Sequence, residues 1–133
     1  MKEARLGKVT EEMVRVAKKE EVEVDVLRRR IAEGRVVLPK NTGRDCEVIG
    51  IGEGLTTKIN ANIGTSSEFC NPDYELEKAK VAVKYGADTI MDLSTGGNLD
   101  MVRRLILKEI KVPVGTVPIY QACLLYTSPS PRD

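Results

Sequence analysis

KINANIGTSS, residues 58–67, is the stretch that decides the fold. Its apolar residues alternate with polar ones, which is the pattern of a β-strand with one apolar face. The two asparagines, Asn60 and Asn62, therefore share the other face of the predicted strand. The run ends in Gly-Thr-Ser-Ser, residues that favour a turn or loop. We predict a strand here whose polar face carries two amides close to its carboxyl end.

Alternating helices and strands follow this stretch with short connections between them. Each predicted helix begins at a residue that commonly caps helices. The expected elements are a helix over 71–87 capped by Asn71 or Asp73, a strand over 88–93, a helix over 99–110 capped by Asn98 or Asp100, and a strand over 112–120. This order is typical of parallel β/α units.

The spacing of these units is regular. Asn62 and Met91 are 29 residues apart, and so are Met91 and Tyr120. Equivalent positions near the carboxyl ends of three successive strands would recur in this way in a (β/α)8 barrel, and a doubly wound sheet is the second option. Both architectures place ligands at these strand ends.

The remaining segments set the expected domain boundaries. Residues 1–46 predict a small helical region, with a helix over 10–22 capped by Thr10, a helix over 24–34 capped by Asp25, and a short extended piece over 36–39. Residues 47–122 form the expected first part of the barrel. The last segment, CLLYTSPSPRD at 123–133, can be back-translated codon by codon into a transposase-type sequencing adapter, so we expect the native sequence to end near Ala122.

Composition excludes several functional classes. A net charge of +1 favours neither nucleic acid nor an anionic membrane as a partner. There is no apolar run long enough to span a membrane and no signal-peptide core, which favours the cytoplasm. The chain has no histidine, and its three widely spaced cysteines, Cys46, Cys70 and Cys123, make neither a disulfide framework nor a CxxC metal motif.

The candidate site residues each have a structural alternative. Asn60 and Asn62 could bind a ligand or bond to neighbouring groups. The loops GTSS (64–67) and STGG (94–97) could hold a phosphate, although turn chemistry explains such loops more often. Asp92 could be a base or could cap the next turn, and Tyr120 could contact a ligand or pack against the fold.

Three segments make the sequence similar to a known family. IGIGEGLTTKINANIGTSS, GADTIMDLSTGGNLD and VPVGTVPIYQA resemble the N-terminal third of the phosphomethylpyrimidine synthases, the thiamine-biosynthesis enzymes often called ThiC. The similarity runs from about Lys2 to Ala122 in the same order. It implies a (β/α)8 barrel preceded by a small domain, of which this chain holds only the first βα units. In the family pattern, the substrate contacts correspond to Asn62, Met91 and Tyr120.

The resemblance also implies a reaction and its cofactors. The family consists of radical S-adenosylmethionine lyases that convert 5-aminoimidazole ribonucleotide into hydroxymethylpyrimidine phosphate, with a [4Fe-4S] cluster and zinc in the full-length enzyme, for which a homodimer is one option. The family's cluster cysteines and zinc histidines would lie beyond Ala122. We therefore expect the 133-residue chain to bind no cofactor and to be inactive by itself.

Two other functions stay open from the residues alone. A different phosphate-binding α/β barrel enzyme would need a catalyst at a strand end, and Asp92 is the best candidate. A standalone module that binds a nucleotide through the two loops of small residues is the non-enzymatic option.

Overall fold

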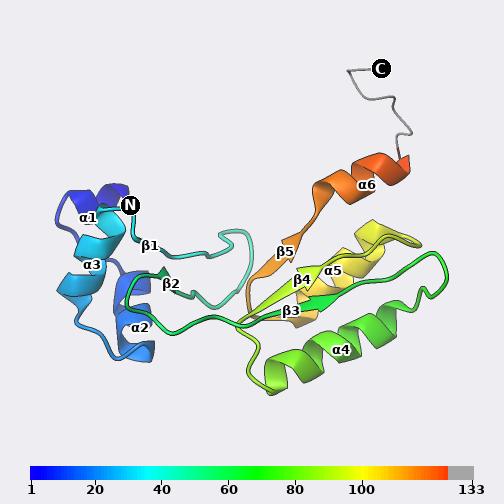
Figure 1. The fold of residues 1–133 in the computed structure, drawn as a ribbon, viewed down its shortest axis with the longest axis horizontal. Helices are drawn as coiled ribbons and strands as arrows, with labels where there is room; N and C mark the ends of the chain where they lie inside the picture. The colour runs from blue at the N-terminus through cyan, green and yellow to red at the C-terminus, as the bar shows by residue number, and fades with distance from the viewer. Residues whose placement is uncertain (126–133) are drawn as a thin grey trace. The chain divides into compact units, whose positions relative to one another are not determined.

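The computed structural model describes residues 1–125, and for Leu124 and Leu125 it describes the backbone alone. Contacts within the chain divide it into two compact units, with the boundary between Lys58 and Ile59. Figure 1 labels the helices and strands of both units. The domain boundaries expected near residues 46 and 122 stay predictions.

The first unit consists mainly of short helices. It contains α1 (Lys2–Arg5), α2 (Glu11–Lys19) and α3 (Val24–Ala32), followed by β1 (Val36–Val37), which pairs antiparallel with β2 (Ile51–Gly52). The apolar sides of these elements enclose one small core, made of Ala4, Met13, Val16, Ala17, Leu27, Ile31, Val36 and Val48. The helices predicted over 10–22 and 24–34 are therefore present as α2 and α3, and the predicted extended piece contains β1.

The two predicted helix starts in this unit have different outcomes. Thr10 caps α2, since its side chain accepts a hydrogen bond from the backbone N–H of Met13 at 3.4 Å. Asp25 does not cap α3, which begins after Glu23. Asp25 lies instead in the first turn, where the helix dipole favours an acid, and it accepts a hydrogen bond from Arg28 at 3.4 Å.

The second unit is a parallel sheet with helices packed against it. Its strands β3 (Asn60–Ile63), β4 (Thr89–Asp92) and β5 (Val114–Thr116) lie side by side in chain order (Figure 1). The crossover helices α4 (Pro72–Lys84) and α5 (Leu99–Glu109) begin at the side-chain caps Asn71 and Asn98, two of the predicted candidates. Their apolar sides pack against one face of the sheet in a core of Ile63, Ala79, Ala87, Ile90, Val102, Ile106, Ile110 and Val112.

The third predicted strand is too long. β5 ends at Thr116, and Pro118 opens a further helix, α6 (Pro118–Leu125), that contains Tyr120. Proline suits the first turn of a helix because its φ is already helical and its missing N–H would have no partner there. The β-branched residues of VPVGTVPIY favour a strand, so the prediction missed the helix that begins at Pro118. The register partner of Met91 in β5 is Gly115, so the 29-residue period relates strand positions for Asn62 and Met91 but not for Tyr120.

The expected adapter-derived segment, 123–133, falls mostly on residues 126–133, which lie outside the described residues. Its first three residues continue α6, although the sequence predicted neither a helix nor a strand there. Over residues 1–125, no helix has both the length and the apolar character needed to cross a membrane.

Candidate functional site

The polar face of the sheet carries two of the three predicted site residues as direct neighbours. Asn62 of β3 pairs with Met91 of β4, which pairs with Gly115 of β5. Side chains alternate along a strand, so these three positions lie on the face opposite to the buried Ile63 and Ile90. Asn62 is exposed there and Met91 is half-buried. The prediction that Asn62 and Met91 occupy equivalent strand positions is confirmed.

The neighbouring amide, Asn60, is held by side chains of the same face. Thr89 Oγ1 donates a hydrogen bond of 2.7 Å to Asn60 Oδ1, and Asn60 Nδ2 donates one of 3.4 Å to Asn62 Oδ1. Asn60 therefore has the structural role, in which the amide bonds to neighbouring side chains. Asn62 is the amide closer to the carboxyl end of the strand.

Tyr120 is placed differently from the sequence expectation. It lies in α6 and not at a strand end, and its backbone N–H donates to the carbonyl of Val117 at 3.1 Å. Its side chain is 43% exposed. Strand pairing thus brings Asn62 and Met91 together but does not align Tyr120 with either.

The two loops of small residues bond to each other beyond the strand ends. Thr65 Oγ1 donates to the carbonyl of Gly96 at 2.7 Å, and Thr95 N donates to the carbonyl of Thr65 at 2.8 Å. The approach is close enough that a Cβ on Gly96 would lie 2.1 Å from the carbonyl oxygen of Ser66. The Thr65 hydroxyl therefore joins the loops, as the turn interpretation requires, and is not free for a phosphate.

Asp92 has a similar structural role at the end of β4. Its carboxylate is buried and accepts hydrogen bonds from the backbone N–H of Ser94 at 3.0 Å and from the Ser94 hydroxyl at 2.5 Å. The same hydroxyl accepts a hydrogen bond from Thr65 N at 3.1 Å. Of the two interpretations of Asp92, the structure supports the cap of the next turn and gives no support to a catalytic base.

One residue that supports this region has no counterpart among the sequence candidates. Glu75 in α4 is 1% exposed; it accepts a hydrogen bond of 2.7 Å from Gly64 N and forms an ion pair of 2.7 Å with Lys78. It joins α4 to the loop that follows β3. Its sequence signal, an acid in the first turn of a helix, is the same as that of an ordinary surface residue.

A hollow lies beside the loops at the start of α5. It has a volume of about 770 Å³ and is lined by Ser67, Thr95, Gly96, Gly97, Asn98, Leu99, Asp100 and Gln121. Gln121 of α6 bonds to Arg103 at 2.9 Å and to Asp100 at 3.1 Å, so two of the lining side chains, Asp100 and Gln121, already bond to each other.

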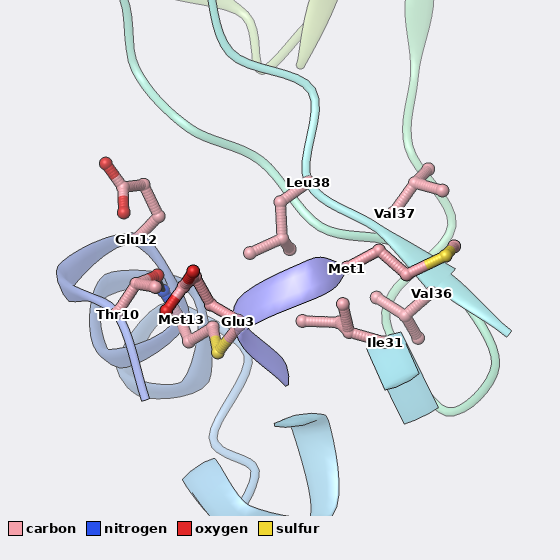
Figure 2. Close-up of a pocket in the computed structure, with 9 residues that line it drawn as sticks. All are labelled: Met1, Glu3, Thr10, Glu12, Met13, Ile31, Val36, Val37 and Leu38. Carbon is pink, nitrogen blue, oxygen red and sulfur yellow. Dashed lines mark hydrogen bonds between the residues drawn. The ribbon is translucent and has the colours of Figure 1, made fainter. Parts of the chain in front are cut away.

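A smaller hollow of about 280 Å³ lies in the first unit (Figure 2). Its lining is mainly apolar, and the polar lining side chains are Thr10, Glu3 and Glu12. A hydrogen bond from Lys40 at 3.0 Å, together with bonds from the Glu12 backbone and Thr10, lowers the pKa of Glu12 to about 2. None of the residues predicted for the site lies here.

The described residues do not provide a metal or cluster site. A [4Fe-4S] cluster is held by cysteine thiolates, and structural zinc by four side chains. Over residues 1–125, no three histidine, cysteine or acidic side chains gather in a way that could hold a metal ion. Cys46 is buried and Cys70 is exposed, both as free thiols.

Comparison with known proteins gives consistent matches. The model of the radical SAM ThiC family matches residues 1–130. The chain is 56% identical to the phosphomethylpyrimidine synthase of Pyrococcus furiosus over 123 residues, which are 92% of this chain and 29% of that enzyme. It is 53% identical to the enzyme of Methanocaldococcus jannaschii and 54% identical to that of Thermus thermophilus, covering 91% and 90% of this chain and 28% of each relative. The chain thus spans less than a third of the length of the curated relatives it matches.

Proposed function

The chain belongs to the radical SAM ThiC family, and we propose that it forms the first part of the substrate site of a phosphomethylpyrimidine synthase. The reaction would convert 5-aminoimidazole ribonucleotide into hydroxymethylpyrimidine phosphate. The observation that carries this proposal is the pairing of Asn62 with Met91 on the polar face of the sheet, at its carboxyl end. Ligands of parallel α/β folds bind at that end.

The side chains suit different parts of such a substrate. The amide of Asn62 can donate and accept hydrogen bonds, as an aminoimidazole and a ribose require. The thioether of Met91 is polarizable and packs well against a flat ring. Tyr120 would contribute a phenolic hydroxyl from α6. Its position in a helix requires α6 to approach the sheet face if all three residues contact one substrate.

A complete site would need the rest of a barrel. Strands in chain order, with both crossover helices on one face, support the first β/α units of a (β/α)8 barrel. The described residues do not fit an iron–sulfur cluster, so no step through the cluster is assigned to them. A zinc site, a homodimer and a cytoplasmic location stay predictions for the longer protein.

The decisive experiment uses a hybrid enzyme. Residues 1–122 of this chain replace the matching segment of the Pyrococcus furiosus synthase, and hydroxymethylpyrimidine phosphate is measured with S-adenosylmethionine and a reductant. We expect the hybrid to be active, and the 133-residue chain alone to give no product, because it lacks a cluster-binding set in its described part. A folded hybrid that is inactive while the parent enzyme works would refute the proposal.

Substitutions in the hybrid test the site residues. Asn62→Ala removes a proposed polar contact and is expected to lower kcat/KM by roughly tenfold or more. Asn41→Ala is the matched control, because Asn41 lies in an exposed turn where it accepts a hydrogen bond from Gly43 N. Equal activities of the two variants would exclude Asn62 as a substrate contact.

A further inference from the structure

Gly115 is the register partner of Met91, and its missing side chain leaves the space that the Met91 thioether occupies. A Cβ built on Gly115 would lie 2.9 Å from Met91 Cε and 3.0 Å from Met91 Sδ. Both distances are well below an ordinary van der Waals contact. The tip of Met91 therefore lies across β5, directly over the glycine.

The crowding involves only the flexible end of one side chain. The methionine side chain has three rotatable bonds and can turn aside at low cost. In contrast, a Cβ on Gly96 would meet the backbone of Ser66. An alanine at 115 should therefore keep the fold and displace the thioether.

We propose that Gly115 is a positioning residue, whose lack of a side chain sets where the Met91 thioether lies on the polar face of the sheet. The proposal rests on the proposed function in so far as it gives Met91 a substrate to contact. Gly115 itself touches no substrate in this proposal and acts through Met91. It also explains why β5 carries a glycine at its central position, where glycine weakens a strand.

The first test follows the thioether directly. In the 133-residue chain, labelled with ¹³C at the methionine methyl groups, Gly115→Ala should shift the Met91 methyl resonance, assigned with Met91→Leu, and leave the Met13 resonance unchanged. Gly43→Ala is the matched control, since the nearest group to a Cβ there, Asn41 Oδ1, is 3.4 Å away. An unmoved Met91 resonance in Gly115→Ala would overturn the proposal.

The second test is kinetic and uses the hybrid enzyme with 5-aminoimidazole ribonucleotide. Displacing Met91 should remove binding that the ground state and the transition state share, so KM should rise roughly tenfold with kcat little changed. In the Met91→Leu background, which lacks Sδ and Cε, Gly115→Ala should cause little further rise in KM. An unchanged KM, or equal effects in both backgrounds, would overturn the role in binding.

The two tests separate this inference from the proposed function. If the unsubstituted hybrid makes no product, the proposed function fails, and the methyl resonance alone decides whether Gly115 positions Met91. If the hybrid is active and the Met91 resonance does not move, the proposed function stands and the role of Gly115 is refuted.

Discussion

At the scale of the residue, the ion pair between Glu12 and Lys40 has the clearest electrostatic effect. The hydrogen bond from Lys40, helped by Thr10 and the Glu12 backbone, holds the pKa of Glu12 at about 2 instead of 4.5. The Glu12 side chain is 36% exposed, so solvent screening keeps the gain in stability small. The pair fastens the segment after β1 to α2 within the first unit.

A titration tests this pair. The pKa of Glu12 is lower in the folded chain than in the unfolded chain, so the stabilisation is fully present above about pH 4.5 and is lost as the pH falls towards about 2. Lys40→Met should raise the pKa of Glu12 towards 4.5, measured from its carboxyl ¹³C shift. Lys18→Met, which removes an exposed lysine of α2, should leave that pKa low; a low pKa in the Lys40 variant would show that Lys40 is not the cause.

Glu20, a second acid in the first unit, is more deeply buried than Glu12. Glu20 pairs with Lys58 at 2.8 Å, and their side chains are 4% and 7% exposed. Burial acts to raise the pKa of Glu20, but the hydrogen bonds from Lys58 and Thr56 outweigh it and the pKa is lowered. This pair fixes the chain just before β3 begins.

At the scale of the element, Glu75 joins α4 to the loop after β3. Its buried carboxylate accepts from Gly64 N and pairs with Lys78. The loop in turn bonds to the loop after β4 through Thr65 and Gly96. One carboxylate therefore joins α4 directly to the loop after β3, and that loop bonds to the loop after β4.

Removing that charge should destabilise the second unit. Glu75→Gln keeps an acceptor for Gly64 N but loses the charge beside Lys78, and we expect it to lower the free energy of unfolding by about 1–3 kcal/mol. Chemical denaturation measures the change. Glu77→Gln, an exposed position of the same helix, should stay within about 0.5 kcal/mol of the parent. Equal stabilities of the two variants would show that Glu75 does not join these elements.

At the scale of the whole molecule, the parallel sheet of the second unit has two unpaired edges within the described residues. β3 and β5 each pair only with β4 among residues 1–125. The outer side of α4 is also exposed, with Tyr74 at 48%, Val81 at 48% and Tyr85 at 79%. Open strand edges and exposed apolar side chains both favour association between molecules.

We therefore expect the isolated chain to bind a hydrophobic dye and to aggregate on heating. Val81→Glu should reduce dye fluorescence, because it places a charge in the middle of the exposed side of α4. Val14→Glu is the control, at a valine of α2 that is 52% exposed but belongs to the first unit. A monomer that binds no dye and unfolds in one sharp thermal transition would contradict this expectation.

Much of the second unit could be predicted because its signals are local. Alternating residues in KINANIGTSS, the caps Asn71 and Asn98 and the regular spacing of Asn62 and Met91 all concern neighbours in the sequence or one β/α repeat. Errors arose where two local signals conflict. In VPVGTVPIY, β-branched residues favour a strand, while Pro118 favours a helix start, and the helix prevails.

The sequence alone determined the family, through its long motifs. It also determined the alternation of strands and helices from β3 to α5 and the shared face of Asn60 and Asn62, because periodicity and helix caps act over a few residues. Only the tertiary structure decided which polar groups have partners. Glu75 meets Gly64, Thr65 meets Gly96, and Gly115 lies under the Met91 thioether through packing between segments distant in the chain. No local pattern records such contacts, since they depend on where each loop and strand lies once the sheet has formed.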